Sequence, residues 1–123
     1  MRIFLGAISL AVVFGATSLA RAESASVAGA RAEALAKIES GALVVDVRTP
    51  EEFATGHLAR ATNVPHTAIA KNLATFGTDK EREIVLYCRS GRRAGLATAE
   101  LRALGYTSVY NAGGYAELAA AAP

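Results

Sequence analysis

The chain has 123 residues, a length that suits one compact domain and argues against two. Hydrophobic residues make up 52% of the chain and charged residues 20%, so it can bury a core, and the composition argues against general disorder. The formal net charge is only +2, which is too small to indicate a protein made to bind nucleic acid.

Residues 1–22 have the three-part layout of a secretory signal peptide. A basic second residue is followed by an apolar run over residues 3–14, and small residues then end in an Ala-Arg-Ala cleavage site at Ala22. The alternative is an uncleaved membrane anchor, because residues 3–20 are nearly long enough to span a bilayer. We expect cleavage, and therefore one domain over residues 23–123 in a periplasmic or secreted protein.

Cleavage changes the balance of charge. It removes Arg2 and Arg21 from the 13 basic residues, which leaves 11 basic against 11 acidic residues and a net charge of zero. No dispersed basic face remains, so we expect no nucleic-acid partner and no membrane contact after cleavage. What remains is a local cluster of three arginines at positions 89, 92 and 93, directly after the only cysteine, Cys88.

The first half of the mature chain alternates helical and strand patterns. Residues 27–40 space their small and aliphatic side chains like one face of a short helix that ends at Gly41. Residues 42–47, ALVVDV, are typical of a buried strand. Thr49 then precedes Pro50 and is followed three residues later by Glu52, which together predict a helix with a capping box.

The second half continues this alternation. Residues 61–65 predict a brief strand, residues 66–77 a helix and residues 83–88, EIVLYC, the clearest strand of the chain. A helix follows from Arg93 to Gly105, in which we expect Leu96, Leu101 and Leu104 to share a face. A strand over 108–112, a Gly-Gly turn and a final helix over 115–121 complete the pattern. Strands that alternate with helices predict a parallel sheet flanked by helices, with ligands at the carboxyl ends of the strands.

Cys88 ends the clearest strand and stands just before a helix. A single cysteine in an exported chain can form an intermolecular disulfide, be buried and inert, or be reactive. Here the helix N-terminus and the nearby arginines favour the thiolate. Gly91 lets the loop curl so that backbone N–H groups point inward and form a nest for an anion. This combination favours a reactive cysteine.

Three separated segments, VVDVRTPEEFATGHLARATNVP, IVLYCRSGRRAGLATAELRALGY and VYNAGGYAEL, resemble a single rhodanese-like domain. The resemblance covers roughly residues 30–118 and implies a three-layer α/β fold, with a central parallel sheet flanked by helices on both faces. It also implies thiosulfate-type sulfurtransferase chemistry, with Cys88 as the sulfur-accepting nucleophile. The remaining residues of the active-site loop would then be Arg89, Ser90, Gly91, Arg92 and Arg93.

Phosphatases with a similar cysteine loop place five residues between the cysteine and an arginine. The residue at that position here is Ala94, and Arg93 follows Cys88 after only four residues. A shorter loop makes a tighter cradle around the sulfur, so we expect sulfur transfer and not phosphate hydrolysis.

The expected mechanism is ping-pong. Cys88 takes sulfur from thiosulfate or a similar anionic donor, forms a persulfide and passes the sulfur to cyanide or a thiol. No metal or organic cofactor is expected. A persulfide carrier or sensor that serves a protein partner, and a non-catalytic binding module, remain as alternatives.

Other residues have weaker assignments. Asp46 and Arg48 match the family's DVR signature and either shape the active-site face or form a structural ion pair. For His57 we expect a structural hydrogen bond and not a role as general base. Two positions depart from the family: Arg60 stands where glycine is common, and Leu118 where tryptophan is common.

Overall fold

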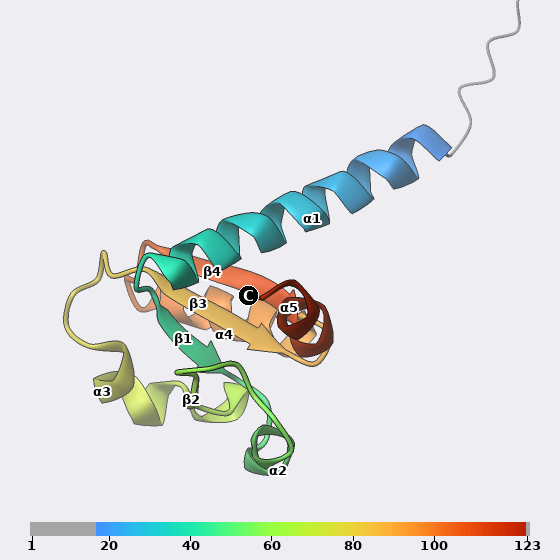
Figure 1. Ribbon diagram of the computed structural model, residues 1–123. Helices are drawn as coiled ribbons and strands as arrows, with labels where there is room; N and C mark the ends of the chain where they lie inside the picture. The colour runs from blue at the N-terminus through green and yellow to red at the C-terminus, as the bar shows by residue number, and fades with distance from the viewer. Residues whose placement is uncertain (1–16, 123) are drawn as a thin grey trace, which may run out of the picture.

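The computed structural model describes the backbone of residues 17–122 and the side chains of residues 26–122. Four parallel strands form one sheet in the order β2-β1-β3-β4 (Figure 1). The strands are β1 (Leu43–Asp46), β2 (Thr62–Asn63), β3 (Ile84–Cys88) and β4 (Val109–Gly114). The predicted parallel sheet with helices on both faces is confirmed.

The central strand β3 is buried on both sides because all five of its side chains are apolar. Ile84, Leu86 and Cys88 pack into one hydrophobic cluster, whereas Val85 and Tyr87 pack into a second. This alternation is the two-residue period of a strand, and it places one core on each face of the sheet.

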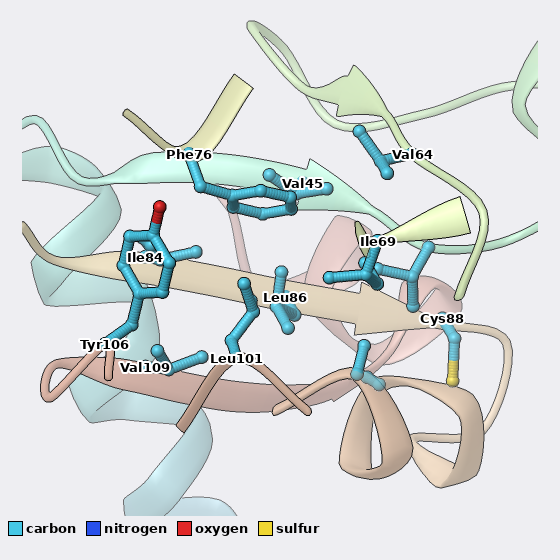
Figure 2. Packing of buried hydrophobic residues seen from close by; sticks show 13 residues of the cluster. Val45, Val64, Ile69, Phe76, Ile84, Leu86, Cys88, Leu101, Tyr106 and Val109 are labelled. Atoms are coloured by element: carbon cyan, nitrogen blue, oxygen red, sulfur yellow. The ribbon is translucent and has the colours of Figure 1, made fainter. Parts of the chain in front are cut away.

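Each core is closed by its own helices. The first face is covered by α4 (Arg92–Ala103) and the short α3 (Leu73–Phe76), and Figure 2 shows Phe76, Leu101 and Tyr106 packed around β3. The second face is covered by α1 (Thr17–Glu39) and α5 (Tyr115–Ala121), which contribute Ala34 and Leu118.

Helix α1 extends past the edge of the sheet (Figure 1). Residues 1–16 of the predicted signal peptide lie outside the described residues, but residues 17–22 form the first turns of α1. The predicted cleavage site after Ala22 therefore lies within a helix, ahead of Ala34, the first buried side chain among those that the structure describes. None of the described helices is long and apolar enough to cross a membrane.

Helix α2 (Pro50–Ala54) begins as the sequence predicts. The Thr49 hydroxyl accepts a hydrogen bond from the Glu52 N–H at 3.2 Å, and the Glu52 carboxylate accepts one from the Thr49 N–H at 3.3 Å. This reciprocal pair of hydrogen bonds is a capping box, and it fixes the position of the Glu52 side chain in the first turn of α2.

The predicted helix over residues 66–77 is wrong in its continuity. The segment forms two 3₁₀ turns, η1 (His66–Ala68) and η2 (Ala70–Asn72), before α3. Asn72 has a non-helical φ of −124°, and its side-chain amide donates to the Ala68 carbonyl oxygen at 2.8 Å. The side chain thus takes the acceptor that a continuous helix would offer to the Asn72 backbone N–H.

The predicted leucine face of α4 is also wrong. Leu101 is buried, but Leu96 is 54% exposed and Leu104 is 38% exposed. The face that meets the sheet consists instead of Ala94, Ala97, Thr98 and Leu101. Its three smallest members sit at true helical spacing, which lets the helix approach the sheet closely, and the two outer leucines fall on the other side.

The backbone at Arg60 has a conformation that favours glycine, the residue that the resemblance leads us to expect at this position. It is the only residue other than glycine with a positive φ in the described part of the chain, at 63°. A side chain with a Cβ is strained in this left-handed conformation, and the exposed Arg60 makes no described hydrogen bond that would offset the strain.

We predict that Arg60→Gly raises the free energy of unfolding by about 1 kcal/mol, because the left-handed backbone no longer strains a Cβ. Arg60→Ala is the matched control, since it removes the charge and keeps the Cβ. Urea denaturation of the three proteins measures the effect. Equal stability of the Gly and Ala variants would contradict the assignment of strain.

Candidate active site

Cys88 lies at the carboxyl end of β3, where Figure 2 shows its sulfur just past the tip of the strand. It is a free cysteine and its relative exposure is 0%. The Gly91 N–H donates a hydrogen bond to Sγ at 2.9 Å, so the loop after β3 curls back over the sulfur. A backbone donor at this distance stabilises negative charge on sulfur.

The curl depends on glycine at position 91. Gly91 has a φ of 94°, in the left-handed region, and is the N-cap of α4. A Cβ at this position would lie 3.2 Å from the Cα of Gly113 on β4. Both the backbone conformation and the close approach of β4 therefore require a residue without a side chain.

Helix α4 begins directly after this turn. Its first backbone hydrogen bond runs from the Gly95 N–H to the Gly91 carbonyl oxygen at 2.9 Å. The N–H groups of Arg92, Arg93 and Ala94 precede that bond and stand at the positive end of the helix dipole. The Gly91 N–H is the one group of the predicted nest that the described residues show bonded to the sulfur, and the rest of the nest stays a prediction.

Strand β4 holds the loop from the side. The Asn111 side-chain amide donates to the Gly91 carbonyl oxygen at 2.9 Å, and its Oδ1 accepts from the Gly113 N–H at 2.9 Å. Gly114 packs so closely that a Cβ there would lie 2.6 Å from the Arg89 carbonyl oxygen. Sequence reasoning missed Asn111; the available signal was a polar residue two positions before a Gly-Gly pair at the end of a strand.

The three loop arginines are not equivalent. Arg89 and Arg92 are exposed and form no ion pair among the described side chains. Arg93 instead donates to both carboxylate oxygens of Glu52, at 2.7 and 3.0 Å. The sequence analysis assigned Glu52 only a capping role and missed this second one.

The ion pair between Arg93 and Glu52 shifts the pKa of both side chains. The pKa of Glu52 is lowered from 4.5 to about 2, chiefly by the hydrogen bonds from Arg93; burial opposes this shift and the hydrogen bonds from Thr49 add to it. The Glu52 hydrogen bonds raise the pKa of Arg93, with smaller contributions from the charges of Glu52, Cys88 and Asp46. The carboxylate is therefore ionised at any neutral pH.

Asp46 and Arg48 form a buried ion pair at the end of β1. The Arg48 guanidinium donates to Asp46 at 2.6 and 3.0 Å and also donates to the Gly56 carbonyl oxygen at 2.6 Å. Its carbon atom Cζ lies 4.6 Å from the centre of the Tyr115 ring. These contacts join the end of β1 to Gly56 and to Tyr115 of α5, and Arg48 also lines a groove together with Arg89 of the loop. The choice between a structural role and a role in shaping the active-site face stays a prediction.

His57 and Leu118 take part in packing. The His57 Nδ1 donates to the Phe53 carbonyl oxygen at 3.0 Å, and the imidazole stacks on the Phe53 ring at 3.7 Å, as the expected structural role requires. Leu118, which stands where the resemblance leads us to expect tryptophan, is fully buried in the second core.

Two open grooves border the loop. One of about 330 Å³ is lined by Arg48, Glu52, Thr55, Arg89, Tyr115 and Ala116. The other, of about 290 Å³, runs between α1 and the loop and includes Ser90, Gly91 and Asn111. Within the described residues, no group of three or more His, Cys, Asp or Glu side chains could hold a metal ion.

Comparison with known proteins agrees with this fold. The family model described as Rhodanese-like domain matches residues 30–121. The Escherichia coli (strain K12) protein named thiosulfate sulfurtransferase PspE is 39% identical over 75 residues, which cover 61% of this chain and 72% of that protein. Thiosulfate sulfurtransferase GlpE of Pseudomonas entomophila is 34% identical over 86 residues, which cover 70% of this chain and 77% of that protein.

A solved structure described as a rhodanese with anions from E. coli superimposes with a TM-score of 0.62. It is 36% identical in sequence, and the match covers 68% of this chain and 95% of the other. A family match over three quarters of the chain, with the same fold, settles the class: the chain belongs to the rhodanese-like domain family.

The pKa of Glu52 leads to a prediction about acid stability. Because this pKa is lowered from 4.5 to about 2 on folding, the ion pair stabilises the protein above pH 4.5 and loses its effect as the pH falls toward 2. Glu52→Gln should therefore be less stable than the parent at pH 7, and the difference should shrink between pH 4.5 and 2. Urea denaturation at several pH values measures this. A difference that is independent of pH would contradict it.

Proposed function

We propose that the chain is a rhodanese-type thiosulfate sulfurtransferase that carries the transferred sulfur as a persulfide on Cys88. The observation that supports this most strongly is the Gly91 N–H bonded to Sγ at 2.9 Å, in a loop that leads straight into a helix N-terminus. The names of the PspE and GlpE relatives support thiosulfate as the donor.

The reaction has two steps. The Cys88 thiolate attacks the outer sulfur of thiosulfate; the S–S bond of thiosulfate breaks, a new S–S bond forms to Sγ and sulfite leaves with the electron pair. Cyanide or a thiolate then attacks the outer sulfur of the persulfide, and the Cys88 thiolate is released. Both steps balance in atoms and charge, and neither calls for a metal or an organic cofactor.

The loop residues have separate roles in this proposal. Gly91 and the first N–H groups of α4 stabilise the thiolate and the terminal sulfur of the persulfide. Arg89 and Arg92, which are exposed, attract the anionic donor. Ser90 forms part of the loop that closes over the sulfur, and the Asp46–Arg48 pair supports the wall beside it.

Because Cys88 is fully buried beneath the loop, the donor reaches Sγ only when the loop parts. The two grooves that border the loop are the approaches to the sulfur. A carrier that receives sulfur from a protein partner has the same requirement, so small-molecule turnover is the property that separates the enzyme from a carrier.

The proposal makes a direct chemical prediction. Incubation of the reduced protein with thiosulfate should add the mass of one sulfur atom, and later addition of cyanide should remove it and yield thiocyanate. Cys88→Ser, which keeps the size of the side chain, should do neither. An adduct that persists in the Ser variant would contradict the proposal, and an adduct without thiocyanate turnover would favour the carrier.

We also propose that residues 1–22 direct export and are removed, so that the mature domain begins at residue 23 in the periplasm or outside the cell. The support is the charged, apolar and small-residue layout of the segment. The cleavage site lies ahead of every buried side chain of α1 that the structure describes, so cleavage leaves the core complete.

Intact mass of the protein recovered from a Gram-negative periplasm tests the export proposal. The expected mass is that of a chain that begins at Glu23. Ala22→Pro should block cleavage, because signal peptidases need a small residue at this position. Recovery of the full-length chain in the membrane fraction would support the uncleaved anchor instead.

A further inference from the structure

The sequence places three positive charges in the active-site loop, but one of them is neutralised by a residue from another segment. Arg93 forms two hydrogen bonds with Glu52, which stands 41 positions earlier on α2. Three guanidinium groups and one carboxylate leave a charge of +2 at the loop, not +3.

We infer that Glu52 is a specificity-determining residue of the proposed sulfurtransferase: it neutralises Arg93 and so limits how strongly the site prefers doubly charged sulfur donors. This inference rests on the proposed function. Arg93 is then a fixed part of the wall of the active site, and the donor's charge interacts mainly with Arg89 and Arg92.

The geometry of the pair supports a fixed Arg93. Two nearly parallel N–H···O bonds hold its guanidinium, and its side chain is only 20% exposed. The capping box holds Glu52 at the other end, because the same oxygen, Oε1, also accepts from the Thr49 N–H at 3.3 Å and from the Thr49 hydroxyl at 3.2 Å. An arginine paired with a carboxylate that is itself held by a capping box is poorly placed to follow a moving donor.

The position of Glu52 gives its charge an influence on the donor. Its side chain is 29% exposed and lines the groove of about 330 Å³, together with Arg89. Arg48, which also lines this groove, is already neutralised by Asp46. A donor in this groove therefore meets one unpaired guanidinium, from Arg89, and one partly exposed carboxylate, from Glu52.

The expected effect follows from Coulomb's law. One unit of donor charge at about 10 Å from one guanidinium, with an effective dielectric constant of about 40 to 80, changes a rate constant about twofold to fourfold at low salt. The effect should disappear at about 1 M salt, where the Debye length is about 3 Å.

Four proteins test the inference: the parent, Glu52→Gln, Arg93→Gln and the double variant, with loop charges of +2, +3, +1 and +2. The donors are the dianion thiosulfate and the monoanion benzenethiosulfonate, which loses its outer sulfur to the thiolate and leaves as the sulfinate. The readout is the ratio of kcat/KM for thiosulfate to that for benzenethiosulfonate at low salt. Because both kcat/KM values are measured on the same protein, a general loss of active protein cancels in their ratio.

The ratio should rise about twofold to fourfold in Glu52→Gln, fall by a similar factor in Arg93→Gln and return to the parent value in the double variant. Glu83→Gln is the matched control. It removes the carboxylate of the Lys37–Glu83 ion pair, which lies next to the amino end of β3, and it should leave the ratio unchanged.

Two results would overturn the inference. A ratio that is the same in all four proteins would mean that Glu52 acts only on structure. A double variant as low as Arg93→Gln would mean that Arg93 binds the donor itself. Failure of the proposed function would look different, since the parent would then form no persulfide with either donor.

Discussion

The hydrogen bond from the Gly91 N–H to the Cys88 sulfur is the contact on which the site depends. It exists because Gly91 adopts a left-handed backbone and because β4 lies close to the loop: a Cβ at Gly91 would lie 3.2 Å from the Cα of Gly113, and a Cβ at Gly114 would lie 2.6 Å from the Arg89 carbonyl oxygen. Asn111 then ties the Gly91 carbonyl oxygen to the same strand. In the closed loop the sulfur is therefore bonded to a backbone N–H whose position is set by the packing of β3, β4 and α4.

The net charge around the active-site loop depends on residues that are far from the loop in sequence. Asp46 neutralises Arg48 at the end of β1, and Glu52 neutralises Arg93 from α2, so two of the guanidinium groups near the loop serve as wall. Only Arg89 and Arg92 remain exposed in the loop. The site is thus less positive than the run of arginines after Cys88 indicates, and its charge is adjustable by changes outside the loop.

Local features were predictable from the sequence because their causes are local. The capping box of Thr49 and Glu52, the buried strand β3 and the turn at Gly91 each depend on neighbouring residues. Tertiary pairings were not predictable in this way: nothing near Glu52 marks it as the partner of Arg93, and the Gly-Gly pair after Asn111 indicates a turn but not the bond from Asn111 to the loop. The leucines of α4 misled for a related reason, since small residues, and not large ones, define the face that meets the sheet.

The central claim is that backbone N–H groups of this loop hold the transferred sulfur on Cys88. A high-resolution crystal structure of the protein after reaction with thiosulfate tests it most directly. The account predicts one extra sulfur bonded to the Cys88 Sγ, with the terminal sulfur within hydrogen-bond distance of N–H groups between Ser90 and Ala94. A terminal sulfur that points out of the loop, toward arginine side chains alone, would contradict it.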